Sequence, residues 1–174
     1  MTPEQDVTFD ADAFMQQTVD EPMATEFAIV DVGTYKAMVH DFTSEIFQKI
    51  DFEYKKGDRA GQPGSMLKCD LPFVLLDDAQ RAKLNKADGQ LLLVNRQMII
   101  DQTSDGQLDF GINKNVALGN VRAAVGQNKK GAWGIANLRG AGPLMVKVAH
   151  ETFKRSDGSP GKKAVVVSCA PLRT

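Results

Sequence analysis

The chain alternates between apolar and polar residues in several short runs, the pattern of β-strands that bury one face. Such runs cover residues 27–30, 34–42, 45–55, 65–76 and 91–101. In the clearest run, apolar and aromatic residues on one side oppose charges on the other: Ile46, Ile50, Phe52 and Tyr54 against Lys49, Asp51, Glu53 and Lys55. Because only Thr43 and Ser44 separate the second run from the third, these two are predicted to form one bent strand.

Helical spacing replaces the alternation after residue 112. Asn113 is a residue type that favours helix N-caps, and Leu118, Val121 and Val125 then recur at i, i+3 and i+7, which predicts a helix over 113–127. A shorter helix is expected over 79–84. Pro72 lacks an N–H group and is therefore expected at a bulge or an edge of its strand.

Residues 144–169 are predicted to form a β-hairpin. Two valine-rich runs flank the dipeptides Asp157-Gly158 and Pro160-Gly161, which supply the backbone angles that a chain reversal needs. The reversal is cationic, with Phe153 at one root and four basic residues around it: Lys154, Arg155, Lys162 and Lys163. A solvated turn and a turn that contacts a polyanion are both compatible with this composition.

The predicted order of elements is therefore three strands, a helix and two strands. This is the order of the OB-fold, a five-stranded Greek-key barrel, so the expected fold class is mainly β with one or two helices. OB-folds bind oligonucleotides on the face of strands two and three, between two flanking loops. Here those loops are residues 55–64 and 153–163, and the polar run Asn95-Arg96-Gln97 of the third strand lies between them.

The overall net charge of −1 conceals an asymmetry. Eight acidic residues and no Lys or Arg precede Lys36, whereas the rest of the chain holds all 21 Lys and Arg against 14 acidic residues. Residues 1–26 are therefore predicted to form an acidic N-terminal arm, partly disordered or packed on the barrel, with one short helical turn near 12–17. Residues 27–174 are expected to be the OB-fold domain.

Other classes of protein find little support in the chain. No apolar run reaches the length of a membrane span and no signal peptide is evident, so we expect a cytoplasmic protein. Cys69 and Cys169 fall inside strands and are expected to be buried free thiols. With two histidines and no nucleotide-binding or nucleophile motif, neither catalysis nor a cofactor or bound metal is expected. A nuclease built on Asp77-Asp78 or on Asp101, Asp105 and Asp109 is the enzymatic alternative.

Four segments together resemble a known family: residues 9–14, 33–39, 113–126 and 146–172. In pattern and order they are similar to bacteriophage single-stranded-DNA-binding-type OB-fold proteins. The resemblance implies non-catalytic coating of single-stranded DNA during replication or recombination in a bacterial host cell. Replication or recombination proteins and a second copy of the chain are then candidate partners. The end of the chain, 170–174, lacks the acidic tail of many such proteins, which leaves the acidic arm as the candidate for recruiting partners.

Binding of a single strand requires cations for the phosphates and aromatic rings for the bases. Tyr35, Tyr54, Trp133 and Phe153 lie near cations, whereas Phe42, Phe47, Phe52 and Phe73 are expected in the core. The predicted nucleic-acid-binding residues are Lys55, Lys56, Arg59, Lys68, Arg96, Lys129, Lys130, Trp133, Phe153, Lys154, Arg155, Lys162 and Lys163. The alternative function is a protein-interaction module that uses the same basic loops against an acidic partner.

Overall fold

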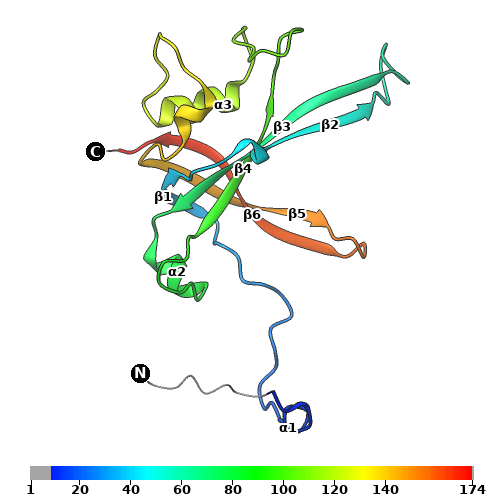
Figure 1. Cartoon of the computed structure of the whole chain (residues 1–174), viewed down its shortest axis with the longest axis vertical. Helices are drawn as coiled ribbons and strands as arrows, with labels where there is room; N and C mark the ends of the chain where they lie inside the picture. The colour runs from blue at the N-terminus through cyan, green and yellow to red at the C-terminus, as the bar shows by residue number, and fades with distance from the viewer. Residues whose placement is uncertain (1–8, 174) are drawn as a thin grey trace.

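The computed structural model describes residues 9–173. Its six strands form one open antiparallel sheet in the order β2-β3-β1-β5-β6, with β4 on the other edge of β3 (Figure 1). The strands are β1 (Gly33–Val39), β2 (Phe47–Glu53), β3 (Pro63–Leu75), β4 (Leu93–Ile100), β5 (Leu144–Lys154) and β6 (Pro160–Pro171). The short helices are α1 (Ala11–Met15), α2 (Asp78–Lys83) and α3 (Val116–Ala124), and two 3-10 turns are η1 (Ser44–Ile46) and η2 (Ile135–Leu138).

The predicted bend near Thr43 and Ser44 is present, but the run is not one continuous strand: β1 and β2 are separate strands joined through η1. Both pair with the same edge of β3, β2 as far as Cys69 and β1 from Phe73 onwards. Pro72 lies in the gap between them, where its carbonyl accepts a hydrogen bond of 2.9 Å from the backbone N–H of His40. The N–H that proline lacks would point into this gap, so Pro72 interrupts neither the ladder with β1 nor the ladder with β2.

The core lies inside the curved sheet and beneath α3. Its largest fully buried side chains are Phe73, Leu71, Leu75, Leu138 and Leu144. Leu118 and Val121 of α3 are buried, as the helical spacing predicts, and α3 packs against β6 and β4. Of the four phenylalanines expected in the core, Phe42 and Phe73 are buried, while Phe47 and Phe52 are half-buried.

The expectation of a mainly β fold is confirmed, but a closed OB-fold barrel is not. Strands β4 and β6 pack against each other, yet within residues 9–173 no ladder of backbone hydrogen bonds joins them. The sheet is therefore open along this seam. One side-chain contact crosses it, from Nη1 of Arg96 on β4 to Sγ of Cys169 on β6, at 3.3 Å.

Two predicted elements differ from the structure. Residues 27–30 are not a strand, since their backbone has no partner strand in the described chain. Helix α3 begins at Val116 rather than 113, and its N-cap is Asn115 in a left-handed conformation. The side chain of Asn115 forms no cap because it bonds instead to Asp101: its Oδ1 accepts from the Asp101 N–H at 2.9 Å and its Nδ2 donates to the Asp101 carbonyl at 2.8 Å.

The closing β-hairpin is confirmed as β5 and β6. Its reversal uses Asp157-Gly158, with Gly158 at a φ of +84° and the Asp157 carboxylate accepting from the N–H of Ser159 at 2.9 Å. Pro160 and Gly161 already belong to β6. Helix α2 also lies where expected, capped by Asp77, whose carboxylate accepts from the N–H of Gln80 at 2.8 Å.

The N-terminal segment leaves the sheet and extends away from it (Figure 1). Every described residue from 9 to 28 is exposed, including all of α1, which forms close to the predicted helical turn. Residues 1–8 of the predicted arm lie outside the described residues. No helix within residues 9–173 is long and apolar enough to cross a membrane.

Candidate nucleic-acid interface

A groove runs along the open seam between β4 and β6. It has a volume of about 470 Å³ and is lined by β3, β4 and β6. Its lining includes Lys68 and Asp70 from β3, Asn95 and Gln97 from β4, and Lys163 from β6. We call this the central groove. It brings together Lys68 and Lys163, two predicted binding residues that lie 95 positions apart in the sequence.

Two hairpins flank the central groove. The β2–β3 hairpin and the β5–β6 hairpin project towards the same side of Figure 1 and diverge from each other. The first carries Lys55, Lys56 and Arg59 at its tip, and the second carries Lys154 and Arg155. Both tips are exposed and cationic, so a polyanion that leaves the groove along β3 or along β6 would meet positive charge.

Both lysines of the central groove lie beside a carboxylate. Lys68 lies 3.5 Å from Asp70, and Lys163 lies 3.6 Å from Glu151 across the hairpin. Because Glu151 and Lys163 are about half exposed, their attraction is screened by solvent. A phosphate can therefore replace Glu151 beside Lys163 at small cost, whereas the Lys68 side chain is only 21% exposed and is less accessible.

Both hairpins carry an aromatic ring packed on a glycine of the neighbouring strand. Phe153 faces Gly161, and a side chain on Gly161 would start 2.6 Å from the Phe153 ring. Phe52 and Tyr54 cover Gly64 in the same way, at 2.7 and 2.8 Å. The glycines thus leave room for the rings to pack on the hairpins. The Phe153 ring packs against Gly161 on one side, and the residue is still 43% exposed.

The structure corrects the expected polar patch Asn95-Arg96-Gln97. Exposure along β4 alternates strictly, so Asn95 and Gln97 point outwards and Arg96 points inwards, where it is only 8% exposed. Arg96 therefore does not line the central groove. The outward face of β4 instead combines the two amides with two half-exposed apolar residues that sequence reasoning missed, Leu93 and Ile99.

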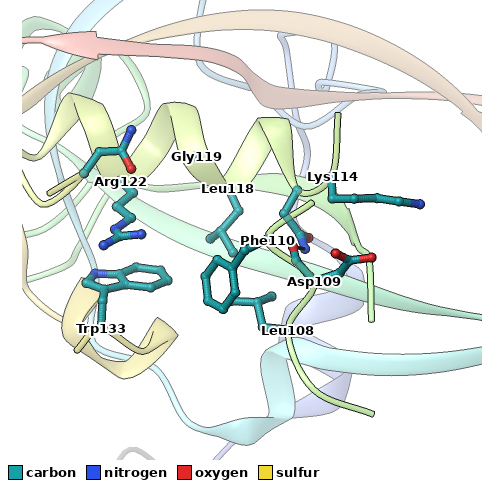
Figure 2. Close-up of a pocket in the computed structure, with 10 residues that line it drawn as sticks. Leu108, Asp109, Phe110, Lys114, Leu118, Gly119, Arg122 and Trp133 are labelled. Carbon is teal, nitrogen blue, oxygen red and sulfur yellow. Dashed lines mark hydrogen bonds between the residues drawn. The ribbon is translucent and has the colours of Figure 1, made fainter. Parts of the chain in front are cut away.

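Trp133, Lys129 and Lys130 lie outside the central groove. Their loop follows α3 and occupies the upper left of Figure 1, away from the tips of both hairpins. Trp133 is half-buried and packs on the core; its indole N–H donates to Gln127 at 2.8 Å. Figure 2 shows the guanidinium of Arg122 over the indole, at 4.5 Å from the ring centre, beside a cavity of about 160 Å³. These contacts give Trp133 a structural role.

Trp133→Ala is therefore expected to lower the free energy of unfolding by at least ~1 kcal/mol, because it removes packing on the core and the contact with Arg122. Affinity for single-stranded DNA should remain close to that of the parent. Urea unfolding followed by circular dichroism measures the first quantity, with Phe110→Ala as the control because Phe110 is 72% exposed on the same side of α3. If Trp133→Ala kept the stability of the parent but lost affinity for single-stranded DNA, Trp133 would belong to the binding surface.

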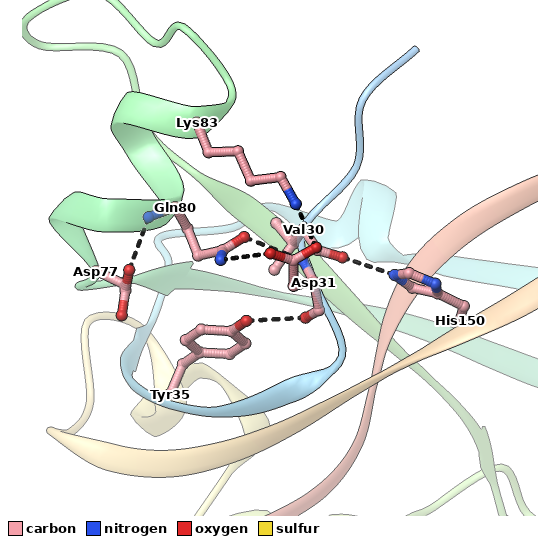
Figure 3. Close-up of polar contacts among 7 residues, drawn as sticks. All are labelled: Val30, Asp31, Tyr35, Asp77, Gln80, Lys83 and His150. Atoms are coloured by element: carbon pink, nitrogen blue, oxygen red, sulfur yellow. Dashed lines mark hydrogen bonds and ion pairs between the residues drawn. The ribbon is translucent and has the colours of Figure 1, made fainter. Parts of the chain in front are cut away.

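The N-terminal segment is anchored where it meets the sheet. Figure 3 shows the anchor, in which Asp31 bonds both to Lys83 and to Gln80 of α2. Nε2 of His150 on β5 donates to the carbonyl of Val30 at 2.7 Å, and the Tyr35 hydroxyl donates to the carbonyl of Asp31 at 2.9 Å. Hydrogen bonds from Lys83 and Gln80 lower the pKa of Asp31, so its carboxylate stays ionised at neutral pH.

The carboxylates proposed for a nuclease are used to hold turns. Asp109 accepts from the N–H of Gly111 at 2.8 Å, Asp101 accepts from the N–H of Asn115 at 2.8 Å, and Asp77 caps α2. Among residues 9–173 no group of three or more His, Cys, Asp or Glu side chains is arranged to hold a metal ion.

Both thiols are expected to react slowly in the native protein. Cys69 is buried as expected, whereas Cys169 is only half-buried. Burial raises the pKa of Cys69 to about 12, and partial burial raises the pKa of Cys169, although the positive charge of Arg96 acts to lower it. Since the thiolate is the reactive form, a disulfide reagent at neutral pH should label both much faster in urea than in buffer. Equal labelling rates in buffer and urea would contradict this burial.

The raised pKa values also predict a dependence of stability on pH. As the pH rises above 9.0, the ordinary pKa of a cysteine thiol, the unfolded chain loses its thiol protons before the folded chain does, so the free energy of unfolding should fall through the alkaline range.

Comparison with known proteins gave no match to any family model, curated protein or solved structure. The functional argument therefore depends on the groove itself.

Proposed function

We propose that this protein binds single-stranded DNA without sequence specificity and without catalysis, in the cytoplasm of a bacterial host cell during phage replication or recombination. The observation that carries the proposal is the central groove: an open, polar channel with Lys68 and Lys163 in its walls, whose β3 and β6 walls each continue into a cationic hairpin. Such a channel suits a flexible polyanion better than a compact small molecule.

The connectivity supports an OB-fold as the scaffold. Strands β1 and β2 correspond to a broken first strand, β3 and β4 to strands two and three, and β5 and β6 to strands four and five, with α3 between strands three and four. The OB-fold is a partly open barrel, and the unpaired seam between β4 and β6 is compatible with that description. The central groove then lies on strands two and three, where OB-folds bind oligonucleotides.

The deciding experiment is a titration of the full-length chain with fluorescent poly-dT over a series of salt concentrations. We expect micromolar or tighter binding at low salt that weakens steeply as salt rises, because bound phosphates release counterions. The same oligonucleotide annealed to its complement should bind more weakly, since a duplex hides its bases. Absence of binding at low salt, or binding that ignores ionic strength, would overturn the proposal.

A further inference from the structure

The central groove continues into a second, more apolar space beside the anchored N-terminal segment. This space has a volume of about 640 Å³, and four residues line both it and the groove: Leu93, Val94, Lys163 and Ala164. Residues 27–30 form one wall, the segment from Leu91 to Val94 forms another, and the β5–β6 hairpin supplies Phe153 and Lys162. We call this space the arm-root trough.

Two exposed aromatic rings line the arm-root trough. Phe153 is held against Gly161 on one side and is 43% exposed, so its ring is a fixed surface with solvent access. Phe27 is 98% exposed and lies three residues before Val30, whose carbonyl is bonded to His150. That anchor keeps the backbone of Phe27 within about 10 Å of Val30, so its exposed ring stays close to the trough that it lines.

The chemistry of the trough suits a nucleobase. Flat aromatic rings and the half-exposed Leu91 and Leu93 offer apolar surface, while Lys86, Lys162 and Lys163 place positive charge at the rim. A base of single-stranded DNA combines a flat apolar ring with an adjacent phosphate. Since the trough and the central groove share lining residues, a strand lying in the groove can place its next base in the trough.

We propose that the arm-root trough is a base-stacking subsite, in which Phe153 and Phe27 contact a nucleobase of the strand bound in the central groove. This inference deepens the proposed function and rests on it. Its consequence is that the N-terminal segment forms part of the binding site: DNA binding packs Phe27 against a base and thereby orders the root of the acidic arm.

The test compares Phe27→Ala and Phe153→Ala in the full-length chain, with Phe110→Ala as the matched control on a different surface. Each of the first two variants should bind poly-dT about 5- to 100-fold more weakly. The dependence on salt should keep its slope, because stacking on a ring releases no counterions. Phe110→Ala should bind as the parent does. Parent affinity for Phe27→Ala, or tighter binding by it, would overturn the subsite.

A second measurement locates the base directly. Poly-dT containing 5-iodouracil is irradiated in complex with the parent protein, and the cross-linked peptide is identified by mass spectrometry. We expect cross-links at Phe27 or Phe153, whereas cross-links confined to Phe52 and Tyr54 of the other hairpin would overturn the inference. If the parent binds no oligonucleotide, the proposed function fails; if the parent binds and Phe27→Ala binds equally well, only the subsite fails.

Discussion

Replacement of Lys162 and Lys163 by Gln in one variant is expected to weaken binding to poly-dT at low salt by on the order of tenfold or more. Both residues are exposed; Lys163 lines the central groove and the arm-root trough, and Lys162 lines the trough. Each phosphate contact on a single strand contributes about 0.7 to the slope of log affinity against log salt. The slope should therefore fall by about 1.4 in this variant if both lysines meet phosphates.

The matched control is the replacement of Lys129 and Lys130 by Gln, which removes the same formal charge from the loop after α3. Both are exposed, but they lie away from the two hairpins. Salt-titrated fluorescence anisotropy on the two variants separates a local effect from one of net charge. An equal loss of affinity in the two variants would show that binding follows the overall charge of the protein, and the central groove would then not be the binding site.

Strands could be predicted from the sequence because a half-buried strand imposes a period of two. β4 shows the strength of this rule. The alternation of Val94, Arg96 and Met98 places Arg96 on the interior face, whereas the charge of Arg96 alone predicts a surface position beside Asn95 and Gln97. The period was the better guide, because an arginine can be accommodated in the interior when its guanidinium finds an acceptor across the seam.

The ends of elements were less predictable, since contacts from distant residues decide them. Asn113 was expected to cap the helix, but Asn115 is the N-cap residue, and its side chain forms hydrogen bonds with Asp101 instead of with the helix. Residues 27–30 have the composition of a strand, yet the bonds to Val30 and Asp31 come from side chains of β5 and α2. Local sequence carries no signal for such partners.

The sequence allowed most of the basic loops around the central groove to be predicted, but not which residues the fold brings together to line it. The two basic loops, one of them the tip of the closing hairpin, were evident from residue types and turn chemistry. That Lys68 meets Lys163 depends on the pairing of β3 with β4 and on the packing of β4 against β6, which are long-range relations. The place of Phe27 depends on the anchor at Val30, so residue type alone favoured Trp133 over Phe27.

Phe73→Ala is expected to be the most destabilising of the substitutions considered, at a cost of ~3–5 kcal/mol. Phe73 is fully buried on β3, paired with Val39 of β1 on one side and with Val94 of β4 on the other. Because β3 is the strand that joins β1, β2 and β4, a cavity at Phe73 removes contacts from both halves of the sheet. Domains of this kind are commonly stable by only about 5–15 kcal/mol, so a large part of the total is at risk.

The same chemical change at Phe27 is the control, because Phe27 is 98% exposed and its loss should alter stability by less than about 0.5 kcal/mol. Urea unfolding followed by circular dichroism gives both values, and similar slopes with different midpoints would show that only the native state changed. The pair also separates stability from binding. Phe73 lies on the interior face of β3, whereas Lys68 and Asp70 of the same strand line the groove. Phe73→Ala should therefore keep its affinity for poly-dT while it remains folded, and Phe27→Ala should lose affinity while its stability is unchanged.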